Sequence, residues 1–129
     1  MLKFVSSALS GWLAVFLLCA GASIPRVARA LLDPVSFSQC MRGHYRLGWA
    51  IPLLAFAHAW IAMSGGLARV VNLAGLWLAT AAWLGMLLQA ALGASLREKT
   101  GADRRTAKRW HFALMALIGA STVAHVVLN

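Results

Sequence analysis

Four histidines are the residues whose type and spacing offer chemistry in this 129-residue sequence: His44, His58, His111 and His125. His44 and His58 are 14 positions apart, and so are His111 and His125. Fourteen residues of α-helix make about 3.9 turns and about 21 Å of rise. The two members of each pair would therefore face nearly the same way at two levels. Neutral imidazole is a common metal ligand, so the elements that carry the two pairs decide what they bind.

The composition places these histidines in a membrane protein. Hydrophobic residues make up 61% of the chain, and charged residues make up 12%, about half the roughly 25% usual for soluble domains. A soluble core of this size could not hide so much apolar surface. The composition therefore excludes an ordinary soluble domain.

Four uncharged runs divide the chain: Phe4–Pro25, Leu47–Ala68, Val70–Leu96 and Trp110–Asn129. Each has about 20 residues or more, enough to cross a hydrocarbon layer of roughly 30 Å. The first run also resembles a signal peptide, but its length favours a retained helix. We predict an all-α integral membrane protein, a single bundle of four transmembrane helices over residues 1–129. The helices are expected at about 4–25, 44–66, 70–96 and 107–128, with Pro25 ending the first.

Basic residues predict how the chain sits in the membrane. Most lie in two segments, between the first two and the last two predicted helices: Arg26, Arg29, Arg42, Arg46, Arg97, Lys99, Arg104, Arg105, Lys108 and Arg109. By the positive-inside rule, both termini are expected on the non-cytoplasmic side, in what we interpret as a bacterial inner membrane. This topology explains the formal net charge of +9 without nucleic-acid binding.

The second and fourth predicted helices run in the same direction, which brings the histidines together by level. His44 and His111 are expected near the cytoplasmic surface, and His58 and His125 near the opposite surface. Haem iron takes two axial ligands on opposite faces of the ring, so each level predicts one non-covalent haem b. Gly48 would leave room for a flat ring beside the backbone. Helix-packing histidines are one alternative, and a copper or zinc site is another.

Three further features narrow the chemistry. The acids Asp33, Glu98 and Asp103 all lie outside the uncharged runs, which argues against a proton-coupled transporter. Cys19 and Cys40 form no C-x-x-C-H motif, so no covalent haem attachment is predicted. Haem propionates need cationic partners, and Arg42, Arg46, Arg105 and Arg109 are candidates near the cytoplasmic haem. The positive-inside rule explains the same arginines equally well.

The segment His44-Tyr45-Arg46-Leu47-Gly48 continues after nine residues to His58, giving H-x-x-x-G-x₉-H. It resembles the ligand helix of ferric-reductase-like transmembrane domains, and Trp110-His111 through His125 resembles their second ligand helix. The resemblance covers about Met41 to Asn129. The b-subunit of quinol–cytochrome complexes shares the spacing and carries ligands on its second and fourth helices. The resemblance implies that all four histidines ligate haem iron.

We therefore expect a di-haem b-type cytochrome that conducts electrons across the bilayer. It would act as an electron-transfer subunit of an oxidoreductase system, with no catalytic side chain of its own. Its partners would be membrane lipid and a redox partner protein or quinone. Two alternatives stay open at this point: a quinone-reactive anchor of a larger oxidoreductase, and a haem-free accessory subunit of a larger membrane complex.

Overall fold

The structure, a computed structural model, describes residues 2–64 and 72–128, with side chains from Ala8 onward in the first helix. Its elements are α1 (Leu2–Leu31), α2 (Pro34–Ser64), α3 (Leu73–Ser95) and α4 (Gly101–Leu128). All four helices are long and apolar enough to cross a membrane. The prediction of an all-helical, four-helix membrane bundle is confirmed at this level.

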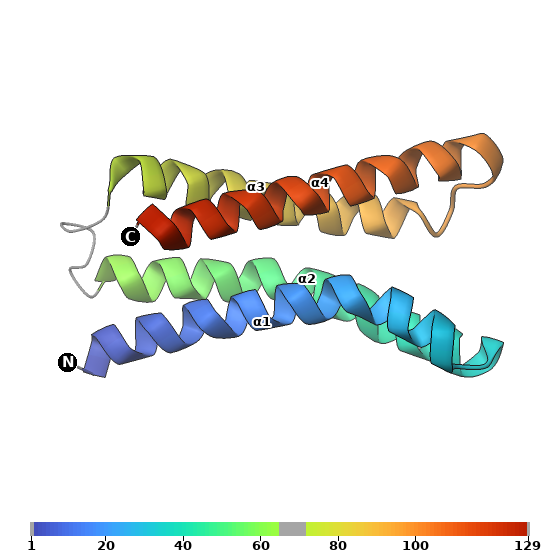
Figure 1. The fold of residues 1–129 in the computed structure, drawn as a ribbon, viewed down its shortest axis with the longest axis horizontal. Coiled ribbons are helices and arrows are strands. Elements are labelled where there is room, and N and C mark those ends of the chain that lie inside the picture. The colour runs from blue at the N-terminus through green and yellow to red at the C-terminus, as the bar shows by residue number, and fades with distance from the viewer. Residues whose placement is uncertain (1, 65–71, 129) are drawn as a thin grey trace.

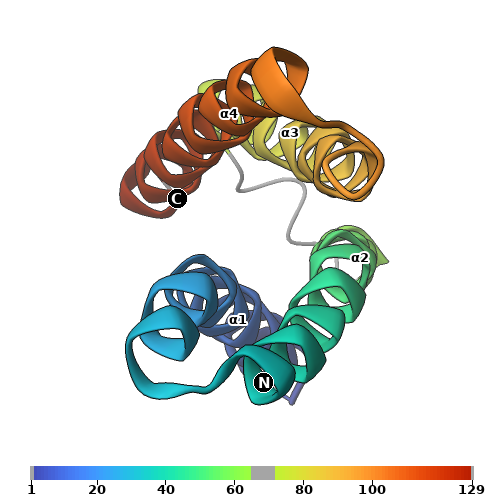
Figure 2. The same ribbon diagram turned by 90° about the vertical axis from the view of Figure 1, so that its right-hand side faces the viewer.

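The helices form two antiparallel hairpins, α1 with α2 and α3 with α4, and α2 packs against α3 to join them (Figure 1). Viewed along the bundle, α2 and α4 occupy diagonal corners (Figure 2). Both chain termini lie at one end, which we call the terminal end (Figure 1). The opposite end carries the α1–α2 and α3–α4 connections, and we call it the basic end. The two histidine-bearing helices therefore face each other across the bundle interior.

The boundary between the first two helices differs from the prediction. The first helix was expected to end at Pro25, but α1 continues through it to Leu31. The second was expected to begin at 44, but α2 begins at Pro34, so only two residues separate the helices. An uncharged run marks the part of a helix that crosses the hydrocarbon, and arginine-bearing turns extend beyond it because their long side chains reach water. The expected boundaries at 66 and 70 lie outside the described residues.

The short connection ends with a helix cap. The Asp33 carboxylate accepts hydrogen bonds from the backbone N–H groups of Val35 at 3.0 Å and Ser36 at 3.1 Å. These bonds satisfy two donors in the first turn of α2 that have no partner within the helix. The Ser36 hydroxyl first, and then the backbone N–H groups of Ser36 and Val35, hold the pKa of Asp33 below its ordinary value by hydrogen bonding. Asp33 and Pro34 thus set the start of α2.

The fourth helix also begins earlier than expected, at Gly101 rather than 107. Gly101 has φ of +55°, a left-handed conformation that costs glycine little. His44 and His111 consequently occupy equivalent positions, each ten residues after the first residue of its helix. His58 and His125 each lie 24 residues after that start, so the two hairpins present their histidines in the same register.

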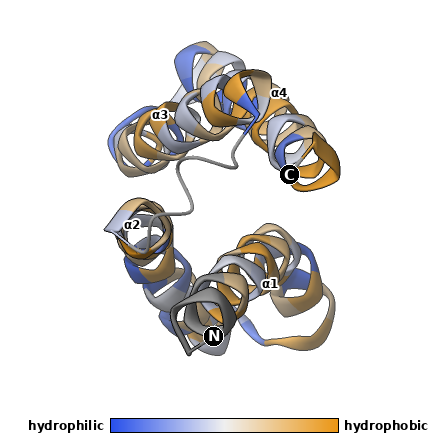
Figure 3. Cartoon of the chain, turned by 90° about the vertical axis from the view of Figure 1, so that its left-hand side faces the viewer, coloured by the Kyte–Doolittle hydropathy of each residue, from blue (hydrophilic) through white to orange (hydrophobic). Residues whose placement is uncertain are grey.

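The bundle interior is small, and the outer surface is apolar. Ile51, Met86 and Ile118 form its buried cluster, and Ile118 is only 1% exposed. Large apolar side chains face outward on every helix, as in Trp12, Leu53, Trp77 and Val127. Hydrophobic residues accordingly appear on the outer faces of the helices as well as between them (Figure 3). Lipid is the solvent that such a surface requires.

A polar contact also ties the hairpins together. The indole Nε1 of Trp83 on α3 donates to the carbonyl oxygen of Pro52 on α2 at 3.0 Å. The Trp83 ring also contacts Phe56, with centroids 5.9 Å apart. Proline removes a helical donor, so the Gly48 carbonyl four residues earlier lacks its usual partner. The α2–α3 interface is thus built around a point where the backbone of α2 is irregular.

Gly85→Ala should destabilise the bundle by about 1–3 kcal/mol, the usual range for overpacking a core. A Cβ there would lie 2.8 Å from Cγ1 of Ile118, so α3 and α4 would have to separate. Thermal unfolding in detergent measures the change. Gly119→Ala is the control, because its Cβ would meet nothing within 4 Å. If Gly85→Ala costs no more than Gly119→Ala, the close α3–α4 approach is contradicted.

Candidate functional site

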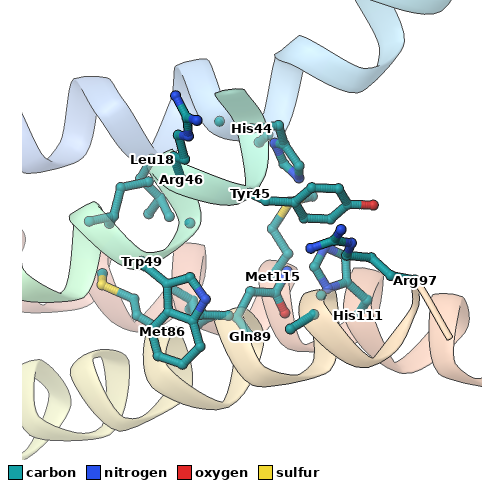
Figure 4. Close-up of a pocket in the computed structure, with 18 residues that line it drawn as sticks. Leu18, His44, Tyr45, Arg46, Trp49, Met86, Gln89, Arg97, His111 and Met115 are labelled. Carbon is teal, nitrogen blue, oxygen red and sulfur yellow. The ribbon is translucent and has the colours of Figure 1, made fainter. Parts of the chain in front are cut away.

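A cavity of about 230 Å³ lies inside the bundle towards the basic end, and all four helices contribute to it (Figure 4). The lining from α1 and α2 is Leu18, Gly21, Ala22, His44, Tyr45, Arg46, Gly48, Trp49 and Ile51. The lining from α3, its C-cap region and α4 is Met86, Gln89, Ala90, Gly93, Ala94, Arg97, His111, Met115 and Ile118. Its wall is mostly apolar, with a few polar groups, as in binding sites for flat organic ligands.

His44 and His111 both line this cavity, one from each diagonal helix (Figure 4). Nδ1 of each ring is buried and makes no hydrogen bond within the described residues. A buried imidazole nitrogen without a partner costs free energy, commonly about 1–3 kcal/mol. The fold thus places His44 and His111 in the lining of one cavity, and their pairing as ligands stays a prediction.

Gln89 adds a third polar atom of this kind. Its Oε1 is buried, lacks a hydrogen-bond partner within the described residues, and belongs to the lining of the same cavity. Buried polar atoms in proteins are nearly all paired, so three unpaired ones around one cavity indicate a place for a ligand. Sequence analysis missed Gln89. The available signal was a polar side chain within the uncharged and largely apolar run Val70–Leu96.

Glycines bring the neighbouring helices close to these rings. A Cβ on Gly93 would lie 3.3 Å from Cε1 of His111. Gly21 of α1 also lines the cavity. Pro25 follows Gly21 by four residues, so the Gly21 carbonyl lacks its usual helical donor. A Cβ on Gly48 would meet nothing within 4 Å among the described residues.

The histidines of the terminal end are placed differently. Nδ1 of His58 lies 3.1 Å from Oγ of Ser10 on α1, and a Cβ on Gly11 would lie 3.0 Å from Cε1 of the same ring. Nδ1 of His125 donates to the carbonyl oxygen of Gly75 on α3 at 2.9 Å. Each of these rings therefore contacts the preceding helix of its own hairpin. Neither belongs to the lining of the basic-end cavity.

Only some of the predicted arginines reach the cavity. All four of these arginines are exposed, and of them Arg46 lines the cavity, whereas Arg42, Arg105 and Arg109 do not. Arg97, which sequence analysis treated only as a topology signal, lines the cavity instead. Its guanidinium carbon lies 5.5 Å from the centroid of the Tyr45 ring, in cation–π range. Charge patterning located the basic end, but it did not identify which side chains turn inward.

The donor set bears on which kinds of metal group the cavity could hold. Among the described residues, no group of three or more His, Cys, Asp or Glu side chains converges. Copper and zinc sites generally need three or four such ligands. Two imidazoles facing one apolar cavity, with arginines in its lining, instead fit a haem with two axial ligands and anionic propionates.

Comparisons with family models, with curated protein sequences and with solved structures find no match to this chain. The case for the site therefore depends on the residues themselves.

Gln89→Met should raise the thermal stability of the ligand-free protein. The substitution keeps a similar volume and removes a buried acceptor that lacks a partner, whose burial costs about 1–3 kcal/mol. Unfolding of the ligand-free protein in detergent measures the change. Gln39→Met is the control, because Gln39 is an exposed glutamine of α2 and should change stability little. A loss of stability specific to Gln89→Met would show that Gln89 contributes a packing or hydrogen-bond interaction to the bundle.

Proposed function

We propose that this protein is a b-type membrane cytochrome that holds two haems and conducts electrons across the bilayer. The observation that carries the proposal is the basic-end cavity, a mostly apolar space that His44 and His111 line from diagonal helices. Haem iron supplies the redox chemistry, changing between ferric and ferrous states by one electron. The protein supplies ligation, burial and the distance between the two sites.

The residues of the basic end divide into three roles. His44 and His111, on diagonal helices, would hold the haem iron. Gly48 and Gly93 let the flat ring approach the backbone, since a side chain at Gly93 would crowd the His111 ring. The guanidinium groups of Arg46 and Arg97 would pair with the propionates.

The terminal end would hold the second haem between His58 and His125. A carbonyl oxygen only accepts hydrogen bonds, so the bond to Gly75 requires that Nδ1 of His125 carries the proton. In a neutral ring this makes Nε2 the nitrogen with the lone pair, which is the arrangement of a metal-ligating histidine. The bond therefore supports a ligand role for His125.

The way the helices pack favours ligand entry between the hairpins. The cavity, about 230 Å³, is below the roughly 300–1,000 Å³ of common ligand sites, so the walls must move apart to admit a haem. Packing is more extensive within each hairpin than between α2 and α3. Separating the two hairpins should therefore cost less free energy than separating the two helices of either hairpin.

The direction of the bundle follows from its charges. Lys and Arg residues gather at the basic end, so that end would face the cytoplasm of a bacterial inner membrane, with both termini outside. Electrons would pass between a redox partner protein or quinone and an acceptor on the other side. Five cationic side chains near the start of α4 suit an acidic partner surface: Lys99, Arg104, Arg105, Lys108 and Arg109.

The protein purified in detergent should contain two haem b per chain and show sharp low-spin bands after dithionite reduction. Each single His→Ala substitution should remove one haem, because a haem held by one imidazole loses half of its axial ligation. His44→Ala and His111→Ala should deplete the same haem, and the double variant should lose no more than either single one. Spectra and haem quantified against protein provide the measurement.

Met86→Leu and Met115→Leu are the matched controls, since both thioethers line the basic-end cavity and thioether sulfur is an alternative axial ligand. Both variants should keep two haems and unchanged bands. A colourless protein that takes up no added haem would refute the proposed function. A single haem lost only with His44 or His111 would restrict it to the basic end.

A further inference from the structure

The terminal-end histidines of the two hairpins have similar positions and similar hydrogen-bond partners. His58 and His125 occupy the same register in α2 and α4, 24 residues after the start of each helix. Each presents Nδ1 to an oxygen on the preceding helix, at 3.1 Å to Ser10 Oγ and at 2.9 Å to the Gly75 carbonyl. The partner of His125 is backbone, whereas the partner of His58 is a side chain that substitution can remove.

A hydroxyl is both a donor and an acceptor, so the bond alone does not say which atom carries the hydrogen. Ligation decides it. When Nε2 of His58 binds iron, the neutral ring must carry its proton on Nδ1, and Ser10 Oγ becomes the acceptor. Ser10 would then act on His58 as the Gly75 carbonyl acts on His125.

We propose that Ser10 is a positioning residue for the terminal-end haem, accepting the Nδ1–H of His58 and thereby fixing its ring and raising its basicity as a ligand. The inference rests on the proposed function, since it assumes that His58 binds haem iron. An acceptor on Nδ1–H makes the imidazole a stronger electron donor and favours ferric over ferrous iron. Ser10 therefore lowers the reduction potential of that haem.

The close approach of α1 supports this role. A Cβ at Gly11 would lie 3.0 Å from Cε1 of His58, so the backbone beside Ser10 runs directly against the ring. This contact limits how the ring can tilt, and the hydroxyl selects one rotation within that limit. At the basic end, Nδ1 of His44 and Nδ1 of His111 have no such bond within the described residues. The effect of Ser10 should therefore be confined to one haem.

Ser10→Ala tests the proposal by redox titration of each haem. The variant should keep two haems and raise one midpoint potential, with the other unchanged. A tenfold loss of preference for ferric over ferrous iron corresponds to about 59 mV for a one-electron couple. Ser10→Thr retains a hydroxyl and should restore the wild-type value. Ser23→Ala is the control, because that hydroxyl lies on the same helix but donates to the Cys19 carbonyl.

The His125→Ala background identifies which haem responds. In a protein left with only the basic-end haem, Ser10→Ala should shift nothing. A shift in that background, or two unchanged midpoints in Ser10→Ala with both haems present, would overturn the role of Ser10 while leaving the cytochrome intact. Equal loss of one haem in Ser10→Ala and Ser10→Thr would also overturn it, because the hydroxyl would then not matter. Absence of haem from the wild-type protein would instead refute the proposed function itself.

Discussion

The constraint on which this structure depends is that polar atoms inside an apolar bundle need partners. Backbone groups meet it by forming helices, because lipid offers no hydrogen bonds. The four imidazoles cannot meet it in that way. Each needs an oxygen or a metal as a partner, because a buried polar nitrogen without one costs free energy. At the terminal end, His58 and His125 find oxygens on the preceding helices. At the basic end, Nδ1 of His44 and Nδ1 of His111 find none within the described residues, and the cavity lies there.

In both hairpins, glycines of one helix pack against the histidines of the other. In each, a helix that carries glycines lies against a helix that carries two histidines in identical register. Gly11 lies against His58, and Gly93 lies against His111, where any larger residue would crowd the ring. Close backbone approach of this kind is how membrane helices gain van der Waals contact when no hydrophobic force drives them together. The glycines therefore serve packing and site geometry at once.

The interface between the hairpins has a different character. It rests on the buried cluster of Ile51, Met86 and Ile118 and on the bond from Trp83 to the Pro52 carbonyl. Near the cavity, Pro25 on α1 and Pro52 on α2 leave the backbone carbonyls of Gly21 and Gly48 without their usual helical donors. The helices pack more extensively within each hairpin than between the hairpins. This arrangement suits a bundle that encloses a flat group along its axis.

The sequence alone determined the number of membrane helices, their all-helical character and the levels of the histidines. Hydrocarbon thickness makes each of these a matter of counting, since charge-free length and rise per residue are enough. The helix ends were harder to predict. α1 passes through Pro25, α2 begins at Pro34, and both helices include arginines that lie outside the uncharged runs. Only the tertiary structure decided which side chains meet: Arg97 and Gln89 turn into the cavity, whereas Arg42 and Arg109 do not. That choice depends on the rotation of each helix about its axis, which is set by packing against the neighbouring helices and not by the local sequence.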